Sequence, residues 1–178
     1  MFTVLDIGGS KVVALAASRH ESGVMNVHGL VSVDSFGMRK GAIADMAAVS
    51  RCADTALRHL AHELGVDNIS SATVLISGTQ VEGSTVQGFK PIIPKNRAIT
   101  NQDVMEVVNH SRSGFCPPEK VQIQAIPREF RVDETRTTQK PVGLSGGKLE
   151  VSSYLVTGNS AHVKNFEVAL SNTDKSVE

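Results

Sequence analysis

The sequence predicts an α/β protein in two parts, with a change of character near residue 80. Short apolar strand patterns alternate with amphipathic helix patterns along the whole chain. After Val81 the strand patterns become shorter, polar turns separate them, and the prolines lie among them. Such alternation is typical of an α/β architecture. We expect a half-subdomain over residues 1–80, an inserted interaction subdomain over 81–158, and a helix returning to the core with a polar tail over 159–178.

The composition fits a globular protein and excludes several functional classes. The chain has 178 residues, of which 40% are hydrophobic and 20% are charged, and its formal net charge is zero. Balanced charge argues against general binding of nucleic acid or anionic lipid. No window approaches about eighteen consecutive apolar residues, so we expect no membrane span and no direct membrane contact. The two cysteines show no Cys-x-x-Cys spacing, which favours a reducing, cytoplasmic setting without a zinc site or disulfide.

The chain opens with a strand, a glycine turn and a second strand. The flanking runs are apolar and rich in Val and Leu. Adjacent glycines allow positive φ and let backbone N–H groups approach an anion. A carboxylate before the turn can hold Mg²⁺ through water, and a hydroxyl and an amine after it can bind phosphate. The pattern predicts a phosphate loop of Asp6, Gly8, Gly9, Ser10 and Lys11, and a plain Gly-Gly hairpin is the alternative.

The next elements complete the first half-subdomain. A third strand over residues 24–33 predicts an antiparallel meander. A helix follows over 46–64, with Asp45 as its N-cap and Gly65 as its stop, and its apolar stripe should cover the sheet. A strong apolar strand over 72–78 then ends in Ser-Gly.

The inserted subdomain contains a helix between short strands. Thr100 and Asp103 begin that helix in a pattern close to a capping box. Ser160 begins a final helix, and the polar tail over residues 172–178 is expected to fray. The strand patterns cover residues 81–89, 92–99, 121–126, 129–133 and 148–156.

Two local patterns are assigned no chemistry, and we assign no catalytic residue. His59, His62 and Glu63 lack the His-Glu-x-x-His spacing of zinc enzymes and lie outside the apolar stripe, which predicts a solvated helix face. The run from Gly143 to Lys148 resembles a P-loop superficially. It lacks the four-residue gap after the first glycine and the following helix, so it predicts a hairpin turn.

Five separate stretches occur in one order between Asp6 and Gly146. They are Asp6 to Lys11, Ser35 to Ile43, Ile69 to Gly78, Ile126 to Phe130, and Pro141 to Gly146. In this order and spacing the chain resembles the N-terminal part of the FtsA family of actin-like bacterial cell-division proteins. The first stretch is similar to the family's first phosphate loop, and the last two are similar to signatures of its inserted subdomain.

The resemblance implies an actin/Hsp70-like (ribonuclease H-like) half-core with an inserted strand-helix-strand-strand α/β subdomain of the SHS2 type. It implies that the complete protein binds ATP and magnesium between two lobes, polymerises, and tethers FtsZ to the membrane. It also implies contacts between the inserted subdomain and other division proteins, and a location on the cytoplasmic face of the inner membrane at the septum. The family offers at most a weak ATPase, so we do not expect an enzyme.

The chain is expected to stop just after the inserted subdomain of that family. The second phosphate loop and the FtsZ-binding lobe would then be missing, so we expect this chain alone to bind ATP weakly or not at all. We also expect an exposed strand edge and an apolar patch, and self-association as their consequence.

Two other functions share the first motif. A sugar kinase of the same superfold needs a catalytic Asp in its core, whereas Asp103 and Asp133 fall in the insertion. A pilus-assembly actin homologue also has an inserted subdomain, but the stretch from Pro141 to Gly146 favours the division protein.

Four basic residues in the insertion are candidate partner contacts. Exposed charges in an interaction subdomain can steer a partner, and a simply solvated surface is the alternative. The candidates are Lys95, Arg97, Arg128 and Arg131.

Overall fold

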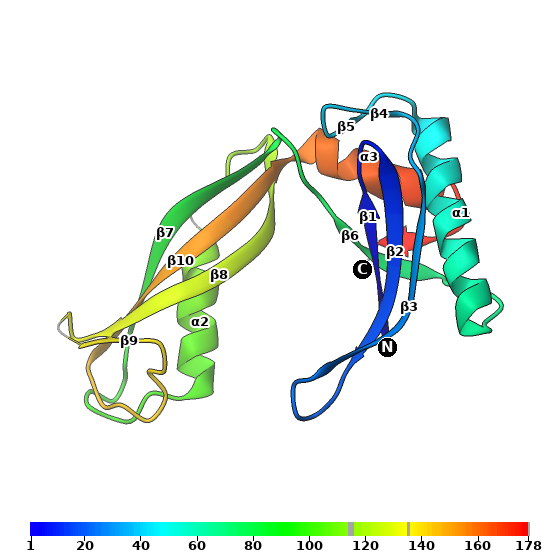
Figure 1. Cartoon of the computed structure of the whole chain (residues 1–178). Coiled ribbons are helices and arrows are strands. Elements are labelled where there is room, and N and C mark those ends of the chain that lie inside the picture. The colour runs from blue at the N-terminus through cyan, green and yellow to red at the C-terminus, as the bar shows by residue number, and fades with distance from the viewer. Residues whose placement is uncertain (114–115, 135, 178) are drawn as a thin grey trace. The chain divides into compact units, whose positions relative to one another are not determined.

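The computed structural model describes residues 1–113, 116–134 and 136–177. Within them the chain forms two compact units (Figure 1). The core unit comprises Met1–Gln80 and Ser160–Glu178, and the inserted unit comprises Val81–Asn159. Among the described residues, no helix combines the length and the apolar character needed to cross a bilayer.

The core unit is built on a five-stranded sheet in the order β11-β6-β1-β2-β3. The first three strands form the expected antiparallel meander, and β6 and β11 add to it in parallel. A two-stranded hairpin, β4 and β5, precedes the first helix. The bounds are β1 (Phe2–Ile7), β2 (Lys11–Arg19), β3 (Met25–Asp34), β4 (Met38–Arg39), β5 (Ala42–Ile43), α1 (Met46–Leu64), β6 (Ser71–Leu75), α3 (Ser160–Ser171) and β11 (Ser176–Val177).

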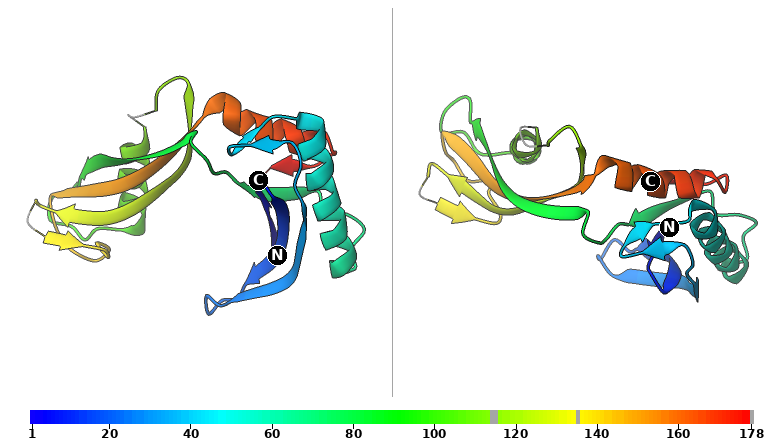
Figure 2. Two further views of the ribbon diagram at one scale, coloured as in Figure 1. Left: turned by 45° about the horizontal axis from the view of Figure 1, so that its top comes forward. Right: turned by 90° about the horizontal axis from the view of Figure 1, so that it is seen from above.

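Helices α1 and α3 cover one face of this sheet (Figure 2). The caps of α1 agree with the sequence, because the Asp45 carboxylate accepts a hydrogen bond from the Ala48 N–H at 3.0 Å and Gly65 takes the left-handed conformation. Alternate strand residues such as Leu5 and Val12 are fully buried against Leu57 and other residues of the two helices. Apolar side chains at every second strand position and along one face of each helix thus pack into one core.

The opposite face of the core sheet remains largely uncovered in the described structure. The strand register places Val4, Leu15 and Leu30 side by side on that face. Leu30 is 60% exposed, and Val27 on the same strand is 62% exposed. The apolar patch expected from the sequence is therefore present.

The inserted unit has a four-stranded antiparallel sheet in the order β7-β10-β8-β9, with one helix on one face. The hydroxyls of Ser111 on that helix and Ser153 on the central strand are hydrogen-bonded at 3.1 Å. Residues such as Val107, Phe130 and Leu149 form a core separate from that of the core unit. The bounds are β7 (Val81–Pro91), α2 (Asn101–Arg112), β8 (Lys120–Val132), β9 (Arg136–Thr138) and β10 (Lys148–Asn159).

Three features of the inserted unit differ from the sequence expectation. Residues 92–99 form no strand, and only Ala98 makes a bridge, to Ser145. The two strands expected around Pro127 are one strand, β8, in which the register shifts so that Arg128 is left over as a bulge. Proline lacks an N–H for the ladder, and a bulge is how a strand accommodates it. The short strand β9 was not expected.

The expectation of a frayed tail is wrong for the described part of residues 172–178. Strand β11 pairs with β6, where Ser176 lies opposite Ser71 and Val177 opposite Ala72. The Lys175 ammonium is buried and donates to the Asp54 carboxylate at 2.7 Å. This ion pair fixes a segment whose composition is polar. Glu178 lies outside the described residues.

Candidate functional site

The predicted phosphate loop is a tight turn between β1 and β2. Ile7 pairs with Val12, and the Gly8 N–H donates to the Lys11 carbonyl at 3.0 Å. A side chain on Gly8 would come within 3.0 Å of that carbonyl, whereas Gly9 has open space around it. The turn therefore requires a small residue at its first position and leaves the second position open to a ligand.

The polar side chains of the loop point away from the core. Asp6 lies in register with Val13, two residues from Lys11, so both charged side chains lie on the uncovered sheet face. Asp6, Ser10 and Lys11 are exposed, and within the described residues none of the three makes an ion pair or a side-chain hydrogen bond. The structure thus brings a carboxylate, a hydroxyl and an amine to one end of the sheet.

Two neighbours of the loop were missed from the sequence. Asp34 on β3 lies opposite Lys11 in the strand register. The Ser35 N–H donates to the Ser10 carbonyl at 3.1 Å, which ties the loop to the end of β3. The sequence predicts the meander that brings Asp34 and Ser35 near the loop. It does not predict which residues lie opposite them, because the register of β2 and β3 shifts at a bulge between Ala16 and Ala17.

The loop residues fit a phosphate and a hydrated magnesium ion. Open backbone at Gly9 and the exposed Lys11 amine suit a phosphate oxygen, and the Asp6 carboxylate suits water bound to Mg²⁺. None of these groups is engaged elsewhere in the described structure, so no ion pair has to break for a ligand to bind.

The two patterns that resemble chemical motifs have the local structure expected of them, a solvated helix face and a turn. His59, His62 and Glu63 are exposed on α1. In the described ranges no cluster of three or more His, Cys, Asp or Glu could hold a metal ion. The run from Gly143 to Lys148 is a turn entering β10, with Gly143 at a φ of 89°.

Arg97 is not a free surface charge, which corrects the sequence expectation. Its guanidinium donates two hydrogen bonds to the Asp103 carboxylate, at 2.6 and 2.8 Å, and its Nε donates to the Ile93 carbonyl at 2.8 Å. Lys90 pairs with the same carboxylate at 2.9 Å. Arg97 therefore has a structural role at the start of α2.

Asp103 is the centre of this polar cluster. Its side chain is only 2% exposed, and it also accepts hydrogen bonds from the Thr100 N–H and hydroxyl, at 2.9 and 2.8 Å. The Arg97 guanidinium, with help from Thr100 and Lys90, holds the pKa of this carboxyl far below its ordinary value, although burial acts in the opposite direction. Because α2 begins at this cap, the cluster fixes one end of the helix.

Arg128 and Tyr154 form a stacked pair on the open face of the inserted sheet. The Arg128 guanidinium lies 4.5 Å from the centre of the Tyr154 ring. The ring also lies across Gly83, where an added Cβ would be 1.9 Å from the hydroxyl oxygen. Gly83 thus makes room for the tyrosine, and the bulge presents Arg128 to its ring.

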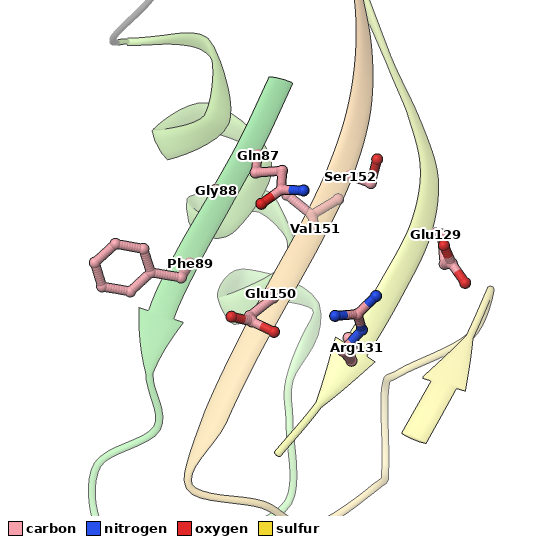
Figure 3. A pocket seen from close by; sticks show the side chains of 8 residues that line it. All are labelled: Gln87, Gly88, Phe89, Glu129, Arg131, Glu150, Val151 and Ser152. Atoms are coloured by element: carbon pink, nitrogen blue, oxygen red, sulfur yellow. The ribbon is translucent and has the colours of Figure 1, made fainter. Parts of the chain in front are cut away.

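Arg131 lines a small cavity of about 120 Å³ on the same open face (Figure 3). Glu150 lies opposite Arg131 in the register, and Phe89 follows on the other side of Glu150. The remaining lining residues are Gln87, Gly88, Glu129, Val151 and Ser152. Lys95, the fourth candidate, is exposed on the loop before α2, with its aliphatic chain beside Gly147.

Comparisons with known proteins agree on one family. A family model described as the SHS2 domain inserted in FtsA matches residues 78–157. The cell division protein FtsA of Streptococcus pneumoniae serotype 2 (strain D39) is 31% identical over 177 residues, which is 99% of this chain and 38% of that protein. FtsA of Escherichia coli K12 is 32% identical over 167 residues, which is 93% of this chain and 39% of that protein.

A solved structure described as the PilM-PilN type IV pilus biogenesis complex shares the fold. It aligns with a TM-score of 0.58 and 17% sequence identity, over 99% of this chain and 45% of that chain. At this identity the likeness supports an actin-like fold and not a shared function. The sequence matches point to one family: the chain is similar to FtsA cell-division proteins over 93–99% of its length, and it spans about 38% of the length of those relatives.

Proposed function

We propose that this chain is the nucleotide-loop and partner-binding part of an FtsA-type cell-division scaffold. The observation that carries the proposal is sequence similarity to FtsA over 99% of the chain, which includes both the loop and the inserted unit. The open, unengaged side chains of the loop support a ligand-binding role for it.

In the complete protein the loop would contact the phosphates of ATP. Gly8 and Gly9 offer backbone close to a phosphate, Ser10 a hydroxyl, and Lys11 a positive charge, while Asp6 holds Mg²⁺ through water. Bound ATP and Mg²⁺ would supply a charged group that joins two lobes. We assign no catalytic residue in this chain and expect at most a weak ATPase in the complete protein.

The scaffold role has three parts in the complete protein. It polymerises, it tethers FtsZ to the cytoplasmic face of the inner membrane at the septum, and its inserted unit binds other division proteins. Lys95, Arg128 and Arg131 are the candidate contacts for those partners, since their charged groups are exposed. We do not retain Arg97, because Asp103 engages its guanidinium.

Self-association of this chain is part of the proposal. The uncovered face of the core sheet exposes large apolar side chains, including Val27 at 62% and Leu30 at 60%. Contiguous apolar surface of this kind favours association in water.

A septation assay tests the role. Overproduction of the chain in the bacterium that encodes it should block septation and give filamentous cells, because the chain competes for division partners. A charge-reversal variant, K95E/R128E/R131E, should lose this effect at equal protein level. The matched control is K164E, whose side chain is 68% exposed on α3, and it should keep the effect. Normal septation with the unmodified chain would contradict the proposal, as would co-purification with pilus proteins in place of division proteins.

A further inference from the structure

Strand β7 is a long edge strand with one free side. It pairs with β10 over eleven residue pairs, from Val81 opposite Gly158 to Pro91 opposite Lys148. No strand in the described ranges pairs with its other side (Figure 1). The backbone groups along that side are available to another strand.

The middle of β7 lacks the usual protection of an edge strand. Residues 83–89 carry no charge, no proline and no bulge, and the charged residues Glu82 and Lys90 lie just outside them. Native edge strands are commonly protected by an inward charge, a lysine, a proline or a bulge. An unprotected stretch of this length is a surface for strand addition.

We propose that the free side of β7 pairs with β7 of a second copy of the chain, in an antiparallel arrangement centred on Val86. This inference rests on the proposed self-association and assigns it a second surface, separate from the uncovered face of the core sheet. The two-fold relation sets residue i opposite residue 172 − i. The resulting pairs are Glu82 with Lys90, Gly83 with Phe89, Ser84 with Gly88, Thr85 with Gln87, and Val86 with itself.

Charge complementarity selects this register. Glu82 of one copy faces Lys90 of the other, twice, and no like charges face each other along the strand. Lys90 already pairs with Glu106, and Glu82 already pairs with Lys120 at 2.5 Å. The dimer would join these two pairs into an alternating row of Lys and Glu side chains at each end of the interface.

Shape complementarity points to the same register on the open face. Figure 3 shows the Phe89 ring on the outer side of β7, away from β10, and Phe89 is 56% exposed. In the dimer this ring lies next to Gly83 of the second copy, which has no side chain and carries the Tyr154 ring. Phe89 of one copy therefore meets the Tyr154 ring of the other, and two aromatic rings in contact across the interface bury apolar surface of both copies.

Paired charges at Thr85 and Gln87 test the register in the full chain. Both positions are exposed, and each faces the other across the two-fold axis. The variant T85K/Q87K places lysine opposite lysine twice, whereas T85K/Q87E places lysine opposite glutamate twice. We expect the dimer dissociation constant of the first variant to exceed that of the second by roughly 2- to 30-fold, from the energies of two cross-strand pairs.

Sedimentation equilibrium over a concentration series gives these constants, and Tyr154 fluorescence checks that both variants are folded. Mixing T85K/Q87K with T85E/Q87E should restore association as a heterodimer. Equal dissociation constants for the two variants, with a self-associating parent, would overturn the β7 interface and leave self-association through another surface. A parent that is monomeric at every concentration would overturn both the interface and proposed self-association, whereas the septation assay judges the division role separately.

Discussion

A single buried carboxylate, Asp103, organises the polar part of the inserted unit. It receives hydrogen bonds from the cap residue Thr100, and it pairs with Arg97 from the preceding loop and with Lys90 from β7. Three segments of chain thus meet at a side chain that is 2% exposed. Removing its charge would leave Arg97 without its carboxylate partner and would leave Lys90 with Glu106 alone.

Asp103→Asn should therefore destabilise the inserted unit. We expect a loss of about 2–4 kcal/mol, below the full cost of breaking a buried pair because Lys90 and Arg97 keep some contact with solvent. Tyr154 is the only tyrosine and the chain has no tryptophan, so its fluorescence during urea unfolding reports on this unit. As a control, Glu106→Gln removes a carboxylate that is 46% exposed and should cost less than about 1 kcal/mol. Equal losses for both variants would contradict the central role of Asp103.

The ionisation of Asp103 should make the stability of the inserted unit depend on pH. Its pKa is lowered in the folded state, first of all by Arg97, whereas an unfolded Asp has a pKa of about 3.9. The unfolded chain therefore binds a proton that the folded chain does not, and stability falls as the pH drops below about 4–5. Urea midpoints between about pH 3 and 6 should show the advantage of the parent over Asp103→Asn shrinking toward acid. Parallel curves for the two proteins would rule out this titration.

The tight turn between β1 and β2 was predictable, because its glycine pattern is local in sequence, and phosphate binding there stays a prediction. Asp34 was not, because its place opposite Lys11 depends on how β2 and β3 pair across a bulge. The same holds for Arg97: a surface charge and a buried ion-pair partner look alike until the position of α2 is known.

Among the elements, α1 and β11 show what local sequence can and cannot predict. Helix α1 has a strong apolar stripe, an Asp cap and a glycine stop, and its predicted bounds match Met46–Leu64. Strand β11 has two residues and no apolar pattern, and long-range partners hold it in place, including β6 and the ion pair between Lys175 and Asp54. Short strands held by long-range partners lack a periodic signal.

Lys175→Met tests how that strand is held. The variant keeps the aliphatic chain but removes the ammonium, which is 6% exposed, so Asp54 loses a buried partner. We expect faster hydrogen exchange in β6 and β11 and a loss of about 1–3 kcal/mol in the core unit. Lys164→Met is the matched control, because this lysine is 68% exposed in a surface pair and should cost less than about 0.5 kcal/mol. Unchanged exchange in β6 would show that the ion pair is dispensable.

At the scale of the whole molecule, the two units have separate cores. The buried residues of the core unit and those of the inserted unit form distinct clusters with no shared member. We expect residues 81–159 expressed alone to fold cooperatively, with the urea midpoint that Tyr154 fluorescence gives in the full chain. A markedly lower midpoint would show that the inserted unit depends on the core unit.

Nucleotide binding by the whole chain gives the last prediction. An actin-type site needs donors from two lobes, and one loop supplies only part of them, so we expect no micromolar affinity for ATP with Mg²⁺. Isothermal titration of the full chain, with and without Mg²⁺, measures this directly. Micromolar binding that disappears in Lys11→Ala would show that the loop suffices by itself.

The pairing of Val81 with Gly158 has a consequence for how such proteins change over time. The two ends of the inserted unit are neighbouring strand residues, about 5 Å apart. The 79 residues of the inserted unit therefore leave and re-enter the core unit at neighbouring points, as a tight turn would. Bringing the two ends of this long insertion together costs little chain entropy. An ancestral core could gain, lose or exchange this module by a single genetic event, and engineers can graft it in the same way.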